Sequence, residues 1–171
     1  MDSSDFAPLI HLPETVNSYD AEFGHTIKDN RLIFSALKAD SSNNAEEVYD
    51  RAYRTKLYYS DRNGLGEFQK SEINTDLFHS NLNYGNGSFS LDGTKYYFSI
   101  CEDDDFKYTC KIVVAQKNDS IWVVTDTLGI QINEKGANST MPFYTRIDEK
   151  EVCLLYTSPS PRDQRGSRMP S

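Results

Sequence analysis

The chain has 171 residues, with 18 Lys and Arg against 26 Asp and Glu and a formal net charge of −8. This negative charge repels the phosphate backbone of nucleic acids, so nucleic-acid binding is disfavoured. The sequence holds no run of 18 apolar residues, so no membrane-spanning helix is expected, and the 11 Tyr, 9 Phe and 1 Trp argue against disorder.

The first part of the chain predicts one four-stranded unit over residues 17–80, after a lead-in over residues 1–16. Apolar and β-branched residues alternate at 23–27, 31–35, 55–60 and 67–70, and turn-forming residues separate most of these segments. An insertion over residues 38–54 lies between the second and third strands. The lead-in begins with acidic residues and lacks the basic and apolar regions of a signal peptide.

Residues 81–128 predict a complete second unit. Asp92 and Gly93 lie between two apolar runs, which indicates a tight hairpin because both central residues of such a turn favour positive φ. An acidic loop is expected from Glu102 to Asp105. The third and fourth strands follow at 111–116 and 121–124, joined by a turn, and complete an antiparallel meander.

A third unit is expected to begin over residues 129–152 and to break off where its second strand should start. Four-stranded units that recur along a chain cannot bury both faces alone, so they stack around an axis. The expected fold is therefore all-β, a partial β-propeller of about two and a half four-stranded antiparallel blades.

Residues 153–171 look like a translated sequencing-library adapter. The match runs from Cys153 to Asp163, and residues 164–171 are then expected to continue the same non-native tail. The alternative is a native linker rich in Ser, Pro and Arg. If this tail is set aside, the remaining chain has 15 cations against 25 carboxylates, a net charge of −10, and ends near Val152.

The segment from Ser88 to Phe98, SFSLDGTKYYF, resembles the core of WD40-like β-propeller repeats of the PD40 type, which also occur in TolB. Residues 16–24, 112–115, 119–122 and 128–136 are similar to other parts of that repeat. Leu91 and Ser120 depart from it, because the repeat usually has Pro and Gly there. The resemblance assigns structural roles in the repeat to Phe23, Gly24, Phe34, Phe89, Asp92, Gly93, Tyr97, Phe98, Trp122, Gly129, Ile132, Asn133 and Pro142.

The long first unit and the spacing of Cys101 and Cys110 look most like Bacteroidetes envelope proteins that combine TPR, PD40 and OmpA-like domains. This resemblance implies a non-catalytic scaffold for protein–protein interaction in the periplasm, associated with the outer membrane. The resemblance implies that the chain is part of an OmpA-like, peptidoglycan-associated protein or of a type IX secretion or gliding protein. The implied partners are other envelope proteins, and peptidoglycan through a domain outside this sequence. The alternative is the gating propeller of a serine peptidase similar to the prolyl oligopeptidases. No residue argues for a carbohydrate-binding or lyase propeller.

The sequence holds no recognisable catalytic constellation, and no metal site or cofactor is expected. His11, His25 and His79 are isolated, and Trp122 and Phe98 are expected to pack between sheets rather than to bind a ligand. Cys101 and Cys110 are expected to flank one hairpin loop, where antiparallel neighbours come close enough for a disulfide. The alternative is two reduced, buried thiols. A disulfide would favour an oxidising compartment such as the periplasm.

Overall fold

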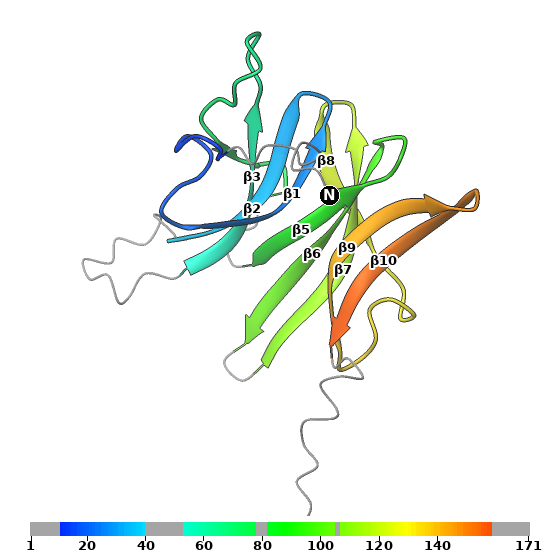
Figure 1. The fold of residues 1–171 in the computed structure, drawn as a ribbon. Helices are drawn as coiled ribbons and strands as arrows, with labels where there is room; N and C mark the ends of the chain where they lie inside the picture. The colour runs from blue at the N-terminus through cyan, green and yellow to red at the C-terminus, as the bar shows by residue number, and fades with distance from the viewer. Residues whose placement is uncertain (1–10, 40–52, 78–81, 105–106, 159–171) are drawn as a thin grey trace, which may run out of the picture.

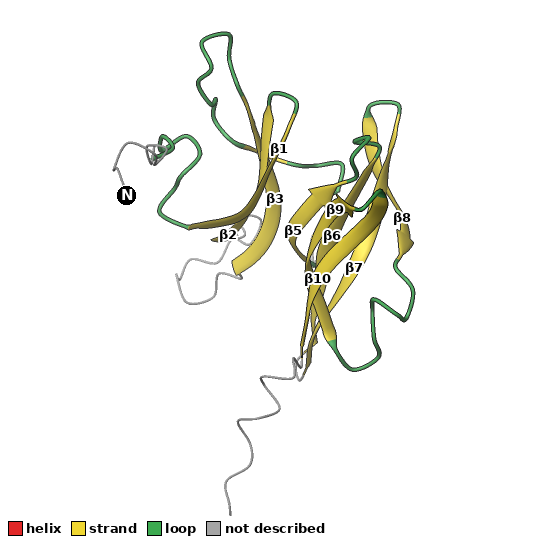
Figure 2. Ribbon diagram, turned by 45° about the vertical axis from the view of Figure 1, so that its right-hand side comes forward, coloured by secondary structure: helices red, strands yellow, loops and turns green. Residues whose placement is uncertain are grey.

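The computed structural model describes residues 11–39, 53–77, 82–104 and 107–158. None of these residues is helical, and their ten strands form three antiparallel sheets (Figures 1 and 2). The prediction of an all-β chain is confirmed. Most of the expected lead-in, most of the insertion and residues 159–171 of the expected tail lie outside the described residues.

The first sheet has the strand order β1–β2–β3–β4. Its strands are β1 (Ala21–Lys28), β2 (Arg31–Ala39), β3 (Tyr53–Asp61) and β4 (Glu72–Ile73). The fourth strand was expected at 67–70 and instead pairs with β3 through Glu72 and Ile73. The cause is a compact loop, in which the Asn63 side chain accepts hydrogen bonds from the N–H groups of Leu65 and Glu67 and delays regular pairing.

The second sheet is a meander with the order β5–β6–β7–β8, as the sequence predicts. Its strands are β5 (Asn83–Phe89), β6 (Lys95–Asp104), β7 (Lys107–Asn118) and β8 (Ile121–Thr127). The acidic residues expected in a loop instead extend β6 as far as Asp104. Paired strands continue past Cys101 and Cys110 to Asp104 and Lys107, so the interpretation of the cysteines as the ends of two strands was wrong.

The β5–β6 turn also differs from the tight hairpin expected at Asp92 and Gly93. Only Gly93 has positive φ, at 70°. The Asp92 carboxylate accepts hydrogen bonds from the Ser90 hydroxyl and from the N–H and hydroxyl of Thr94, at 2.6 to 3.0 Å. These bonds hold a longer turn, which Ser90 and Lys95 close through a backbone hydrogen bond of 2.9 Å.

The third sheet contains β9 (Asn138–Ile147) and β10 (Lys150–Ser158). Asp148 and Glu149 join them with φ of 47° and 60°, so both central residues of this turn have positive φ. Pairing does not stop at Val152 but continues through residues 153–158, which the sequence analysis placed in a non-native tail. Apolar, aromatic and β-branched residues dominate this segment, and such residues favour strands whatever their origin.

The main hydrophobic core lies between the first and second sheets. Ile33 and Leu57 come from the first sheet, and Tyr84, Phe98 and Val113 come from the second, each at most 7% exposed. A second cluster lies on the opposite face of the first sheet, where Val16 covers Leu32 and Phe34. The first sheet is therefore covered on both faces, and the second sheet packs against both the first and the third.

The same polar contacts recur at the two interfaces between sheets. Asn83, at the start of β5, accepts a hydrogen bond from the Thr55 N–H of β3 at 2.9 Å. Asn138, at the start of β9, accepts one from the Cys110 N–H of β7, also at 2.9 Å. In both cases the side chain at the start of a sheet's first strand satisfies a backbone donor of the preceding sheet.

A second recurring contact occurs where the first strand of each sheet bulges. Asn86 and Met141 both have positive φ, at 44° and 53°. The Asn86 N–H donates to the Ser35 hydroxyl of β2 at 2.8 Å, and the Met141 N–H donates to the Ser99 hydroxyl of β6 at 3.1 Å. Gly24, with φ of 61°, lies at the bulge of β1. The three sheets therefore share one local construction.

Candidate functional site

A cleft of about 420 Å³ opens between the first and second sheets, at the end where their hairpin turns lie. The β1–β2 turn and the loop after β4 form one wall, and the β5–β6 and β7–β8 turns form the other. Figure 2 shows the turns of the two sheets at this end of the molecule. The cleft thus draws its lining from segments that are far apart in the sequence but converge because the two sheets stack.

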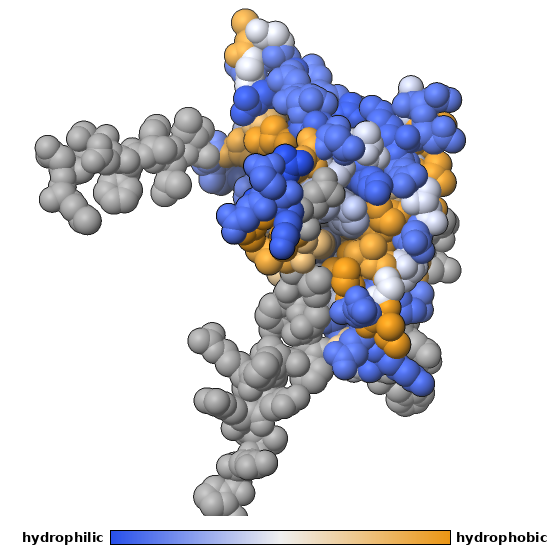
Figure 3. All heavy atoms as spheres, turned by 90° about the vertical axis from the view of Figure 1, so that its right-hand side faces the viewer, coloured by the Kyte–Doolittle hydropathy of each residue, from blue (hydrophilic) through white to orange (hydrophobic). Residues whose placement is uncertain are grey.

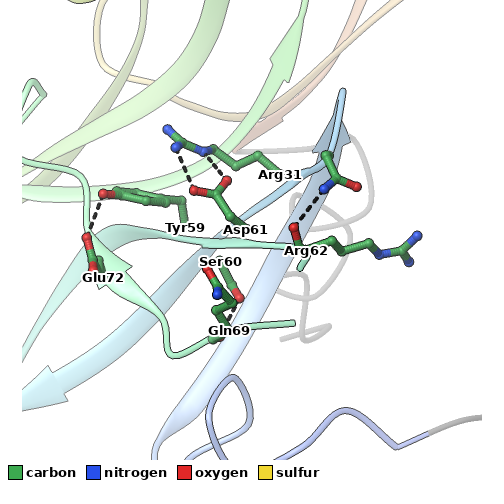
Figure 4. A network of polar contacts seen from close by, with 8 residues as sticks. Arg31, Tyr59, Ser60, Asp61, Arg62, Gln69 and Glu72 are labelled. Carbon is green, nitrogen blue, oxygen red and sulfur yellow. Dashed lines mark hydrogen bonds and ion pairs between the residues drawn. The ribbon is translucent and has the colours of Figure 1, made fainter. Parts of the chain in front are cut away.

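The first-sheet wall contains a network of polar contacts (Figure 4). The Arg31 guanidinium donates two hydrogen bonds to the Asp61 carboxylate, at 2.7 and 2.8 Å, and lies 4.1 Å from the centroid of the Tyr59 ring. The Tyr59 hydroxyl donates to the Glu72 carboxylate at 2.7 Å. The network links β2, β3 and β4 and fixes the shape of this wall.

The network shifts the proton affinities of its members. The hydrogen bond from Arg31 lowers the pKa of Asp61, and the hydrogen bond to Asp61 raises the pKa of Arg31. The hydrogen bond to the Glu72 carboxylate raises the pKa of Tyr59. All three groups therefore keep their ordinary charge states near neutral pH. Their polar atoms are engaged in hydrogen bonds with other residues of the chain.

Aromatic side chains form the second-sheet side of the cleft. Trp122 packs against Phe89 at 5.6 Å and against Tyr96 at 6.2 Å between ring centroids, and both Trp122 and Phe89 line the cleft. Trp122 was expected to act as a packing residue alone. It does pack, but it is only partly buried and also forms part of an open surface.

The cleft is also lined by polar side chains that are available to bind a ligand. Within the part of the chain that the structure describes, the side chains of Asn74, Thr75, Asp76, Lys117 and Ser120 have no hydrogen-bond or ion-pair partner. The first three follow β4, and the last two flank the β7–β8 turn. These groups can bond to a ligand without first breaking a contact within the protein.

The disulfide expected from the sequence is present in the structure. Cys101 of β6 and Cys110 of β7 face each other directly, with Cα atoms 4.1 Å apart, and their sulfurs are bonded. Both cysteines also line a smaller cavity of about 170 Å³, which residues of all three sheets surround. The bridge thus lies within a strand pair, near the junction of the three sheets.

The repeat residues named from the sequence occupy several kinds of position. Phe34 and Phe98 are 2% and 0% exposed at the same place in β2 and β6, whereas Phe23 is 37% exposed. Tyr97 stacks on Tyr144 of the third sheet at 5.3 Å. The remaining members are turn, bulge, linker or partly buried packing residues, namely Gly24, Phe89, Asp92, Gly93, Trp122, Gly129, Ile132, Asn133 and Pro142.

Asn133 shows why the linker between the second and third sheets has its sequence pattern. Its amide group donates to the carbonyls of Ile112 and Leu128 at 2.9 and 2.7 Å, and its oxygen accepts from the Ile112 N–H at 2.8 Å. The Gly129 carbonyl accepts backbone hydrogen bonds from Ile132 and Asn133. The linker is thereby fixed to β7, the third strand of the preceding sheet.

The histidines do not gather at the cleft. His11 contacts Asn17 at 3.2 Å, His25 lines a groove on the outer face of the first sheet, and His79 lies outside the described residues. No group of three His, Cys, Asp or Glu suited to holding a metal ion occurs among the described residues. The side chains from Asp103 to Asp105, in the acidic segment expected as a loop, are likewise outside this description.

Sequence reasoning missed Ser35, Ser99, Asn83 and Asn138, which make the recurring contacts between sheets. A pattern for them is present in the sequence: each serine follows a buried phenylalanine, at Phe34 and Phe98, and the two asparagines lie at matching strand starts. The polar cleft was missed too, because it depends on how two sheets stack.

Comparison with protein-family models, curated proteins and solved structures finds no match to this chain. Across the described ranges, no helix has the length and apolar character needed to cross a membrane.

Proposed function

We propose that the three sheets are successive blades of a β-propeller of the WD40-like type, and that the chain acts as a non-catalytic scaffold for protein–protein contacts in a bacterial envelope. The observation that carries this proposal is the repetition of the same contacts at two interfaces. Asn83 and Asn138 bond to the preceding sheet in one way, and Ser35 and Ser99 accept bulge N–H groups in another. A repeated interface is what stacked blades require.

Exposed apolar side chains on the third sheet support a role in binding protein. Phe143 of β9 and Leu154 of β10 are directly paired and are 58% and 51% exposed, and Met141 is 57% exposed. Figure 3 shows the side of the molecule on which β9 and β10 lie, where apolar and polar surface are interspersed. Large apolar side chains exposed on paired strands offer surface for contact with another protein.

The bonded cysteines support an envelope location. Disulfides form and persist in oxidising compartments and are rare in the cytosol, where thiols are kept reduced. The Cys101–Cys110 bridge therefore favours the periplasm, where the outer-membrane-associated proteins that this chain resembles would meet their partners. Other envelope proteins are the proposed partners, and the chain is proposed to be part of an OmpA-like, type IX secretion or gliding protein.

Site-specific photocross-linking tests the proposed function. A benzophenone amino acid is placed at Phe143, and as a control at Tyr19, an aromatic residue that is fully exposed outside the strands. Irradiation in the periplasm of a Gram-negative host is expected to give discrete protein adducts from position 143 and none from position 19. The same adduct pattern from both positions, or no adduct from either, contradicts the scaffold function.

A further inference from the structure

The cleft between the first and second sheets has the dimensions of a small-molecule site. Its volume of about 420 Å³ lies within the range of about 300–1,000 Å³ that is usual for ligand pockets. The Arg31–Asp61 pair keeps its first-sheet wall in place, and strands β7 and β8 support its other wall. Because both walls are held in place in this way, the cleft can bind a ligand without rearrangement of the sheets.

The charges that line the cleft balance one another. Its cations are Lys28, Arg31 and Lys117, and its carboxylates are Asp29, Asp61 and Asp76, three of each kind. The whole chain, in contrast, carries a net charge of −8. A lining without net charge gives no overall preference for an anion or a cation, so an uncharged ligand fits it best.

The cleft side chains that have no hydrogen-bond partner within the described residues match a ligand that carries many hydroxyls. Asp76 can accept two hydrogen bonds, Asn74 can accept and donate, and Ser120 can do both through its hydroxyl. Planar carboxylate and amide groups bond well to hydroxyls on neighbouring carbons, because each presents two polar atoms side by side. The two walls of the cleft thus offer both donors and acceptors to a ligand.

Trp122 adds an apolar surface to these polar groups. A sugar ring has faces of C–H groups and a rim of hydroxyls, so it packs an apolar face on an aromatic ring while its rim makes hydrogen bonds. The contacts with Phe89 and Tyr96 hold the Trp122 ring in place before any ligand arrives. We infer that the cleft is a binding site for an uncharged saccharide of one or two sugar units, with Trp122 as the stacking surface and Asp76 and Asn74 as the main hydrogen-bonding groups.

The inference is independent of the proposed scaffold function, because it rests on the lining of one cleft and not on the number of sheets or on a protein partner. It also has a convenient probe. Trp122 is the only tryptophan in the sequence, so the intrinsic tryptophan fluorescence of the whole chain reports on this cleft alone.

The full chain is titrated with neutral mono- and disaccharides of glucose, galactose, mannose and N-acetylglucosamine, and with glucuronic acid for comparison. At least one neutral sugar is expected to change the Trp122 emission saturably, with a dissociation constant of about 1 mM, a usual strength for a few hydrogen bonds and one stacked ring. The absence of saturable change with every neutral sugar, or saturation with glucuronic acid alone, overturns the inference.

A pair of matched variants locates the binding. Asp76 is exposed and its side chain makes no hydrogen bond or ion pair within the described residues, so Asp76→Asn leaves the fold intact and is expected to weaken sugar binding about tenfold. Asp148→Asn is the control, since Asp148 lies in the β9–β10 turn, does not line the cleft, and has a positive φ that asparagine tolerates. Equal affinity in the Asp76 variant and the control overturns the assignment to this cleft.

Discussion

The partly buried Asn133 side chain makes three hydrogen bonds, to the Ile112 N–H and to the carbonyls of Ile112 and Leu128. Asn133→Asp keeps the shape of the side chain but replaces its N–H donors with a charged oxygen facing two carbonyls. We expect the free energy of unfolding to fall by about 2–4 kcal/mol.

Urea denaturation, followed by far-UV circular dichroism, measures this change. Asn118→Asp is the matched control, because Asn118 is exposed at the β7–β8 turn and its side chain has no partner among the described residues. A loss of stability that is the same in both variants would show that Asn133 does not fix the linker.

Asp92 titrates at an unusually low pH. Hydrogen bonds from the Ser90 hydroxyl and then from the N–H and hydroxyl of Thr94 lower the pKa of its carboxyl group to about 2, from 3.8. A carboxyl group with a depressed pKa in the folded state adds stability that is present above pH 3.8 and is lost as the pH falls toward 2. We therefore expect the β5–β6 turn to loosen only in that acidic window.

An NMR titration of the Asp92 side-chain carboxyl carbon checks this expectation, and the predicted midpoint is about 2. An Asp92 midpoint close to 3.8 would mean that the carboxylate does not hold the turn in solution.

At the scale of the elements, the two serines that accept hydrogen bonds from bulge N–H groups should contribute equally to the free energy of unfolding. Ser35 and Ser99 are 0% and 3% exposed, and each accepts a hydrogen bond from one N–H group of the following sheet. Ser35→Ala and Ser99→Ala each leave such a donor unpaired, so each is expected to cost about 1–3 kcal/mol of unfolding free energy.

Thermal and urea unfolding of the two variants measure these costs, with the exposed Ser120→Ala as a control that should change little. Near-equal losses in the two buried variants agree with one repeated interface. A loss in one variant and none in the other contradicts the equivalence of the two interfaces.

The elements also show what the sequence could and could not specify. Alternating apolar residues located the strands of the second sheet well, because period-two patterning reports directly on a half-buried strand. The β4 position and the longer β5–β6 turn were missed because side-chain bonds by Asn63 and Asp92 override simple turn preferences. Strand pairing through residues 153–158 was missed because that segment was judged by its apparent origin and not by its strand propensity.

At the scale of the whole molecule, the sequence predicted a repeat but not the surface that the repeat creates. The cleft beside Trp122 depends on which turns face each other when two sheets stack, and no local pattern contains that information. The interface residues are different, since the recurrence of Ser after Phe34 and Phe98 could have been found by aligning the two units.

The central claim is that the three sheets stack on one another through the same contacts at both interfaces, and a nitrogen-edited NOESY spectrum of the labelled chain tests it most directly. The account predicts cross-peaks from the Asn86 amide proton to the Ser35 side chain and from the Met141 amide proton to the Ser99 side chain, whose heavy atoms are 2.8 and 3.1 Å apart. Cross-peaks that instead connect either amide to a different strand, or that join the three sheets into one continuous sheet, would contradict it.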